Sequence, residues 1–253
     1  MNKDKVNFGF KEVNREEKSA LVKEIFSNVA KKYDLMNDLM SLGVHRIWKN
    51  KMIEEINFSG DGKSFNVIDV AGGTGDIAFR IAKKARLKNV KCVIDVVDIN
   101  QEMLDVGKAR AIDGNLFHDL KFTCCDGEKL SFADETFDFF TIAFGIRNFT
   151  NIDLALSEAH RVLKKSGKFI CLEFSKVNDY FLQKIYDAYS FKVIPKIGEI
   201  VLQDKNSYQY LVESIRKFPS QNDFQKMIEK AGFRNVAYKN LSFGAAAIHV
   251  GVK

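Results

Sequence analysis

A glycine-rich turn between two apolar segments is the feature that most limits what this chain can fold into. Residues 66–71 are mostly apolar and lead into Gly-Gly-Thr-Gly at 72–75, and a second apolar segment, 91–98, ends in Asp98. A strand, a glycine turn, a helix and a second strand that ends in a carboxylate together form a nucleoside-binding unit of parallel α/β sheets. The sequence therefore predicts a cofactor site at the carboxyl ends of parallel strands.

Apolar segments and helical patterns alternate through the middle of the chain. Strands are predicted at 66–71, 91–98, 121–125, 137–143 and 168–174, with helices at 75–87, 101–112, 151–164 and 178–191. Because the strands are largely apolar and helices separate them, we expect a doubly wound parallel sheet that is covered on both faces.

The two ends of the chain depart from this alternation. Residues 17–57 have helical spacing, and 192–219 form an insertion rather than a further strand–helix unit. A helix is expected at 221–231, and the strands 236–242 and 245–252 that follow are close enough to pair antiparallel. An antiparallel hairpin at the end of a parallel sheet favours a methyltransferase core over a dehydrogenase.

Length and composition favour a single domain. The chain has 253 residues, 46% of them hydrophobic, and no linker rich in proline or serine. We expect one domain with an N-terminal helical lid (1–60), a cofactor-binding core (61–180), a substrate-side insertion (181–220) and a C-terminal helix and hairpin (221–253).

The net charge limits the binding partners to expect, and the cysteine content indicates the redox environment. The net charge is +6, but the lysines are scattered, which favours solvated helix faces and contact with an anionic membrane surface over nucleic acid. No apolar run reaches the roughly 18 residues of a membrane span. The 4 cysteines lack the spacing of metal ligands, so we expect reduced thiols, a cytoplasmic location and no metal site.

The glycine turn leaves two cofactors formally open. Gly73, Gly75 and Ala78 fit the dinucleotide pattern G-x-G-x-x-A, which is weak evidence by itself. Asp69 and Asp76 bring negative charge to the place where a pyrophosphate would bind, and this charge suits the sulfonium and amino groups of S-adenosylmethionine. S-adenosylmethionine is therefore the expected cofactor.

Later strand ends supply further cofactor and catalytic candidates. Asp98 is placed to accept from two ribose hydroxyls, and Asp126 and Gly127 lie where an adenine ring would bind. Arg147 and Asn148 follow the fourth strand and offer hydrogen-bond donors to the reacting groups. The structural alternatives are a solvated strand-end carboxylate at Asp98, a simple turn at Asp126 and a helix start at Arg147.

The chain resembles, over nearly its full length, the C-methyltransferases of ubiquinone and menaquinone biosynthesis. The first signature of that family is matched by Tyr33-Asp-x-Met-Asn37 with Ser41, His45 and Trp48. The second is matched by Arg161-Val-Leu-Lys164, Gly167 and Leu172-Glu-Phe-Ser175, and further matches are Phe144-Gly-Ile-Arg-Asn148, Tyr208-x-Tyr-Leu211 and Phe218-Pro219.

The resemblance implies a fold and a reaction. The fold is a Rossmann-like class I S-adenosylmethionine-dependent methyltransferase, with a mostly parallel seven-stranded sheet and an antiparallel C-terminal hairpin. The reaction is methyl transfer to a ring carbon of a prenylated quinol, either a methoxy-polyprenyl-benzoquinol or demethylmenaquinol. The resemblance does not decide between these two substrates.

The resemblance also implies roles for individual residues. Cofactor contacts fall on Thr74, on Asp98, on Asp126 and Gly127, and on Ala143, where relatives have serine and one side-chain hydrogen bond is therefore missing or replaced. Gly73 and Gly75 are cofactor candidates from the glycine turn itself. Arg147 would stabilise a developing phenolate and Asn148 would position a water or the hydroxyl, with a bound water rather than Arg147 as the base. Second-rank substrate candidates are Tyr33, His45, Asp204 and Tyr208, and for His45 a structural role beside Trp48 is an equal alternative.

The expected partners follow from the hydrophobic prenyl tail of the substrate. We expect a prenylated quinol, no nucleic acid, peripheral contact with the inner face of the membrane, and a homodimer or a larger quinone-biosynthesis assembly. Residues 181–202 are rich in aromatic and branched side chains, which suits a groove for the prenyl tail as well as ordinary core packing. The alternatives are a methyltransferase for another acceptor, a non-catalytic member of such an assembly, and a dehydrogenase, which Asp76 and the final hairpin disfavour.

Overall fold

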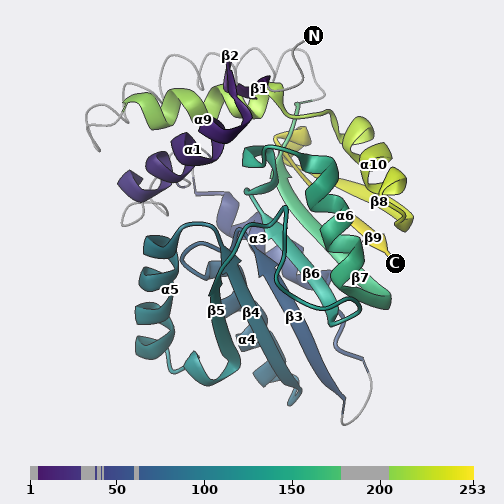
Figure 1. The fold of residues 1–253 in the computed structure, drawn as a ribbon. Helices are drawn as coiled ribbons and strands as arrows, with labels where there is room; N and C mark the ends of the chain where they lie inside the picture. The colour runs from purple at the N-terminus through teal and green to yellow at the C-terminus, as the bar shows by residue number, and fades with distance from the viewer. Residues whose placement is uncertain (1–4, 30–37, 39–40, 42, 60–62, 178–204) are drawn as a thin grey trace.

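A seven-stranded sheet forms the centre of the structure (Figure 1), which is a computed structural model. The strand order is β5-β4-β3-β6-β7-β9-β8. The structure describes all residues except 1–4, 30–37, 39–40, 42, 60–62 and 178–204, so the helix predicted at 178–191 lies outside the described residues.

The sheet is parallel except at one edge, as the sequence predicts. Strands β3 to β7 pair parallel with their neighbours, and β9 pairs antiparallel with both β7 and β8. The strands are β3 (Ser64–Val70), β4 (Lys91–Asp98), β5 (Leu120–Cys124), β6 (Phe137–Ala143), β7 (Leu163–Phe174), β8 (Arg234–Leu241) and β9 (Ala246–Val252).

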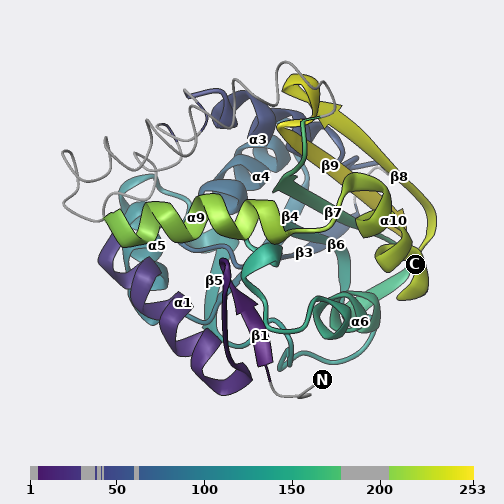
Figure 2. The same ribbon diagram turned by 90° about the horizontal axis from the view of Figure 1, so that it is seen from above.

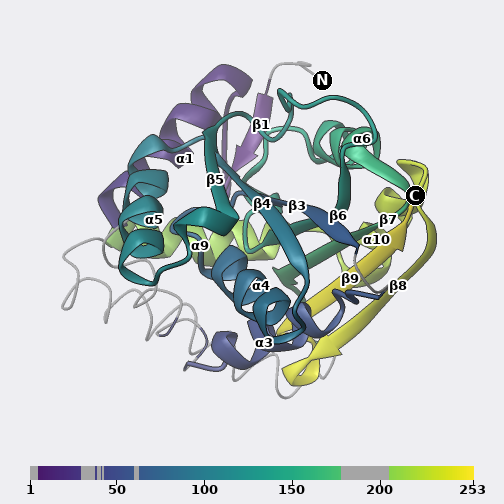
Figure 3. The same cartoon turned by 90° about the horizontal axis from the view of Figure 1, so that it is seen from below.

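Helices cover both faces of the sheet (Figure 3). One face packs against α3 (His45–Glu54), α4 (Asp76–Leu87) and α5 (Gln101–Asp113), and the other against α6 (Ile152–Val162) and α10 (Gln221–Lys230). Neighbouring strand residues contribute to opposite layers, so Val67 belongs to the first core and Ile68 to the second. This two-sided burial explains why the strands read as nearly continuous apolar runs.

A further layer lies across one end of the sheet (Figure 2). It consists of α1 (Arg15–Val29), α9 (Lys205–Lys217) and the hairpin β1 (Lys5–Phe8) and β2 (Lys11–Asn14). Phe8 stacks on Tyr210 of α9 with ring centroids 4.4 Å apart, and Phe10 N–H donates to Glu213 Oε2 across 2.9 Å. The hairpin is therefore attached to α9.

Two segments differ from the sequence prediction. The residues read as an insertion contain α9, and the hairpin β1–β2 precedes the region that was predicted to be helical. The strand β7 also begins at Leu163 rather than at residue 168. Each strand of the hairpin has only four residues, which is too short for an alternating apolar pattern to show.

Short 3-10 helices occur beside the strand ends. They are η2 (Phe117–Asp119), η3 (Ile146–Asn148) and η5 (Ser242–Gly244). Among the described residues we find neither a helix long and apolar enough to cross a membrane nor a cluster of side chains suited to a metal ion.

Candidate cofactor and active site

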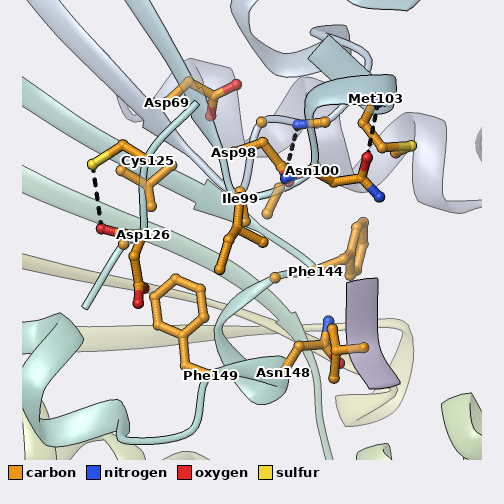
Figure 4. Close-up of a pocket in the computed structure, with 18 of the residues that line it drawn as sticks. Asp69, Asp98, Ile99, Asn100, Met103, Cys125, Asp126, Phe144, Asn148 and Phe149 are labelled. Carbon is orange, nitrogen blue, oxygen red and sulfur yellow. Dashed lines mark hydrogen bonds between the residues drawn. The ribbon is translucent and has the colours of Figure 1, made fainter. Parts of the chain in front are cut away.

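A cavity lies at the carboxyl ends of β3, β4, β5 and β6, next to α1 (Figure 4). It is lined by Asn148 and by six of the seven residues predicted to contact the cofactor, namely Gly73, Thr74, Asp98, Asp126, Gly127 and Ala143. The seventh, Gly75, shapes the turn instead: it has a φ of 84°, and a Cβ there would lie 2.8 Å from Phe79 Cζ. The strand ends thus bring together residues that are far apart in the sequence.

Asp98 joins the glycine turn to the end of β4. Its Oδ2 accepts a hydrogen bond from Gly73 N–H across 2.9 Å, and its Oδ1 accepts from Asn100 N–H across 2.9 Å. Burial raises the pKa of Asp98 to about 6. Each carboxylate oxygen can accept more than one hydrogen bond, so the group retains acceptor capacity for two ribose hydroxyls.

Asp69 is the observation that best tests whether S-adenosylmethionine fits. Its Oδ1 accepts from Thr141 Oγ1 across 2.8 Å, whereas Oδ2 is buried and has no partner among the described residues. Burial raises the pKa of Asp69 to about 7. A buried carboxylate oxygen of this kind beside the cavity suits a cationic ligand group, which would pair with it.

The charge of Asp76 is balanced within the protein. Lys49 Nζ lies 2.7 Å from Asp76 Oδ2, and Arg80 Nε lies 3.0 Å from Oδ1. Burial alone would raise the pKa of Asp76. The two cations lower the pKa by more than burial raises it, so the pKa lies below its usual value. Asp76 was expected to bring negative charge to the cofactor site, but Lys49, which comes from α3 outside the turn, balances that charge.

Thr74 and Gly127 are held by their neighbours. Thr74 Oγ1 accepts from Arg110 across 2.8 Å and keeps its own proton for donation. A Cβ on Gly127 would lie 2.7 Å from Phe149 Cζ and 2.9 Å from Val70 Cγ1, so glycine lets the Phe149 ring pack against the backbone. The same wall carries Asp126, whose Oδ1 accepts from Glu128 N–H across 2.8 Å.

Arg147 and Asn148 are adjacent in η3 but face different cavities. Asn148 lines the cofactor cavity, and Arg147 lines a second cavity behind Phe149 and Thr150. The Arg147 side chain is 2% exposed and lies 2.7 Å from Oε1 of Glu173, which is 1% exposed. Burial raises the pKa of Glu173, and the charge of Arg147 opposes that shift.

Asn148 is oriented by α9. Its Oδ1 accepts a hydrogen bond from the Tyr210 hydroxyl across 3.0 Å, and burial raises the pKa of Tyr210 well above its usual value. In the sequence, Tyr210 stands out only as part of the signature Tyr208-x-Tyr-Leu211. The signature was therefore a usable signal, but the contact with Asn148 required the tertiary structure.

Of the second-rank candidates, only His45 has a described side chain, and it does not line the cofactor cavity. His45 is buried in α3, where its Nε2 lies 2.8 Å from Asp38 Oδ1 and burial lowers its pKa. This contact favours the structural reading of His45. Tyr208 belongs to α9, but its side chain is outside the description, and Tyr33 and Asp204 lie outside the described residues.

Comparisons with known proteins identify the family of this chain. The model of the ubiE/COQ5 methyltransferase family matches residues 11–253. The chain is 54% identical over 250 residues to the "Ubiquinone/menaquinone biosynthesis C-methyltransferase UbiE" of Rickettsia bellii (strain RML369-C), covering 99% of each chain. It is 52% identical over 248 residues to the protein of that name from Rickettsia akari (strain Hartford), covering 98% of each.

Solved structures show the same fold at low identity. A SAM-dependent methyltransferase from Thermotoga maritima, described as a possible histamine N-methyltransferase, aligns with a TM-score of 0.60 at 19% identity over 91% of this chain and 99% of that one. A SAM-dependent methyltransferase from Aquifex aeolicus aligns with a TM-score of 0.59 at 16% identity over 88% and 96%.

The fold is that of a class I methyltransferase, the class that uses S-adenosylmethionine as methyl donor. Within that class, the chain belongs to the ubiE/COQ5 methyltransferase family. The predicted fold class, enzyme class and cofactor are thereby confirmed.

Proposed function

We propose that this protein methylates a ring carbon of a prenylated quinol in ubiquinone and menaquinone biosynthesis. The observation that carries the proposal is the near-full-length identity of 54% to a protein named as a C-methyltransferase of that biosynthesis. The cavity of the present structure supports it, because buried Asp69 and half-buried Asp98 flank the glycine turn and match the cationic and ribose parts of the cofactor.

The chain's own residues bind the cofactor in three places. Asp98 accepts from the ribose hydroxyls, Asp126 and the Gly127 amide meet the adenine ring, and Asp69 pairs with the amino group. When bound, S-adenosylmethionine supplies an electrophilic methyl group on a sulfonium. Ala143 lines the same cavity but contributes no side-chain hydrogen bond.

Asn148 is the side chain that we assign to the reacting end of the cavity. Because its Oδ1 accepts from Tyr210, its amide N–H groups are the donors that it offers to a quinol oxygen or to a water. Holding that oxygen fixes the orientation of the ring, and alignment of the reacting atoms is a large part of catalysis in such transfers.

Arg147 is assigned an electrostatic role. The ortho carbon becomes nucleophilic when the neighbouring phenol loses its proton, and positive charge beside the site stabilises the resulting phenolate. Arg147 keeps its own proton, so a bound water is the base. Glu173 and the carbonyl of Phe144 hold the guanidinium in place, and a direct contact with substrate would compete with these bonds.

The substrate side and the assembly remain proposals. We propose that Tyr33, Asp204 and Tyr208 contact the quinol, and that the protein acts as one domain in peripheral contact with a membrane that holds the prenyl tail. Flotation with anionic vesicles would test the membrane contact. Light scattering would test the homodimer or larger assembly.

Methyl transfer from labelled S-adenosylmethionine to short-prenyl benzoquinol and naphthoquinol tests the function. The wild type should form product, and Asn148→Ala and Arg147→Ala should lose roughly a hundredfold or more in rate, the scale of other lost electrostatic contacts. Lys51→Ala changes an exposed residue paired with Glu54 and serves as the control. Wild-type turnover of RNA but not of quinol would contradict the proposal.

A further inference from the structure

Lys49 is a buried cation beside the cofactor cavity. It comes from α3, which is not part of the strand–turn–helix unit, and its side chain is only 4% exposed. Its Nζ donates to Asp76 Oδ2 across 2.7 Å. The charge thus lies at the start of α4, next to the glycine turn.

The cavity is rich in acids and poor in bases. The acidic residues that line it are Asp69, Asp76, Asp98, Asp126 and Glu128, and the basic residues, among those that the structure describes, are Lys23 and Lys49. The acids suit the two positive groups of the cofactor. Among the described residues of the lining, only these two lysines carry a positive charge that could pair with the carboxylate of the cofactor.

The two lysines have different neighbours in the cavity wall. The backbone oxygen of Lys23 accepts from Asn100 Nδ2 across 3.3 Å, and Asn100 N–H in turn donates to Asp98 Oδ1. Lys23 is therefore on the ribose side. Lys49 lies at Asp76, beside the glycine turn, where the amino-acid end of the cofactor would extend beyond the ribose.

Lys49 has capacity for a second anion. An ammonium carries three N–H donors, and Asp76 accepts one of them. Asp76 also pairs with Arg80 across 3.0 Å, so its charge does not depend on Lys49 alone. A buried ammonium is stabilised when an anion satisfies its remaining donors.

We propose that Lys49 binds the carboxylate of the amino-acid end of the cofactor and makes the cavity select ligands that keep this carboxylate. The inference rests on the proposed function, since it presupposes S-adenosylmethionine. With Asp69 at the amino group, the two side chains would recognise both charges of the amino acid.

Calorimetric binding of two product analogues tests the inference without turnover. One is S-adenosylhomocysteine and the other is its decarboxylated analogue, which differs only in the missing carboxylate. Wild type, Lys49→Met, Lys49→Arg and Lys23→Met are compared. Loss of one charge-assisted contact should weaken S-adenosylhomocysteine binding to Lys49→Met roughly ten- to a hundredfold.

Selectivity for the carboxylate is the deciding readout. Lys49→Met should bind the decarboxylated analogue within about threefold of wild type, and Lys49→Arg should keep most of the preference for S-adenosylhomocysteine. Lys23→Met should resemble wild type. If Lys49→Met fails to fold, Lys49→Gln is used instead, because its amide keeps a hydrogen-bond donor for Asp76 without the charge.

Three results would overturn the inference. Equal loss of both ligands in Lys49→Met would mean a general disturbance of the cavity, and a carboxylate-specific loss in Lys23→Met would place the contact at the other lysine. Unchanged binding by Lys49→Met would reject Lys49 while leaving the proposed function intact. Failure of wild type to bind S-adenosylhomocysteine would instead reject the cofactor on which both rest.

Discussion

The Tyr210 hydroxyl donates to Asn148 Oδ1 across 3.0 Å and joins residues 62 positions apart in the sequence. Tyr210 also stacks on Phe8 of the N-terminal hairpin. The orientation of Asn148 at the cofactor cavity therefore depends on α9 and on the hairpin, neither of which belongs to the parallel sheet.

Removing that hydroxyl should slow the reaction more than it destabilises the fold. Tyr210→Phe keeps the aromatic stack and loses one hydrogen bond, worth about 1 kcal/mol. We expect kcat to fall roughly tenfold, because Asn148 is no longer held, with little change in S-adenosylhomocysteine affinity. Steady-state kinetics and calorimetry measure these quantities. If Tyr210→Phe lowers kcat by the same factor in an Asn148→Ala background, Tyr210 does not act through Asn148.

Neutralising Glu173 should destabilise the protein strongly. Glu173→Gln leaves the buried Arg147 guanidinium without its counter-charge, and breaking a buried pair in this way costs about 3–5 kcal/mol. Urea unfolding measures the free energy of unfolding. Glu54→Gln is the matched control, because Glu54 is 61% exposed and its pair with Lys51 should contribute less than about 1 kcal/mol.

Titration of Asp69 should lower the stability of the ligand-free protein as pH rises from about 4 to about 7, against the opposite contribution of His249, whose pKa burial lowers from 6.5 to about 4. Burial raises the pKa of Asp69 from 3.8 to about 7, so the folded protein holds a proton in this window that the unfolded chain has released. Asp69→Asn should reduce the slope by up to about 1.4 kcal/mol per pH unit. Asp105, which is 60% exposed, provides the control Asp105→Asn.

The measurement is urea unfolding at a series of pH values. Asp98 contributes in the same direction between about pH 4 and its pKa of about 6, so some slope should persist in Asp69→Asn. An identical slope in wild type and Asp69→Asn would show that Asp69 does not titrate in this window.

Ala143→Ser should strengthen cofactor binding. Ala143 lines the cavity, and a serine hydroxyl there would add one hydrogen bond to the ligand, worth roughly a two- to tenfold gain in affinity. Calorimetry with S-adenosylhomocysteine measures the gain. The control is Ala155→Ser, which makes the same change at a buried position of α6 away from the cavity. Affinity of Ala143→Ser equal to or weaker than that of wild type would contradict the expectation.

The parallel strands and the cofactor carboxylates were predictable because their signals are local. Apolar runs mark strands that are buried on both faces, and glycines mark the turn that brings Gly73 N–H within 2.9 Å of Asp98. Parallel strands end at one edge, which places Asp98 and Asp126 at the same cavity once the topology is known.

The hairpin and α9 were missed for physical reasons. The strands β1 and β2 are short and polar, and they are stabilised by contact with Tyr210 and Glu213 rather than by a pattern of their own. The apolar face of α9, formed by Leu211, Val212 and Ile215, likewise packs in the core against distant residues. Stability that comes from such contacts is not visible in a short stretch of sequence.

The family, the alternation of strands and helices, and the acids at the strand ends could all be predicted from the sequence, because neighbouring residues encode each of them. It took the folded structure to show that Asn148 and Arg147 face different cavities and that Lys49 neutralises Asp76. Those outcomes depend on Tyr210, Glu173 and α3, which are distant in sequence. Electrostatic and hydrogen-bond partners are chosen by proximity in space, and proximity exists only after the chain has folded.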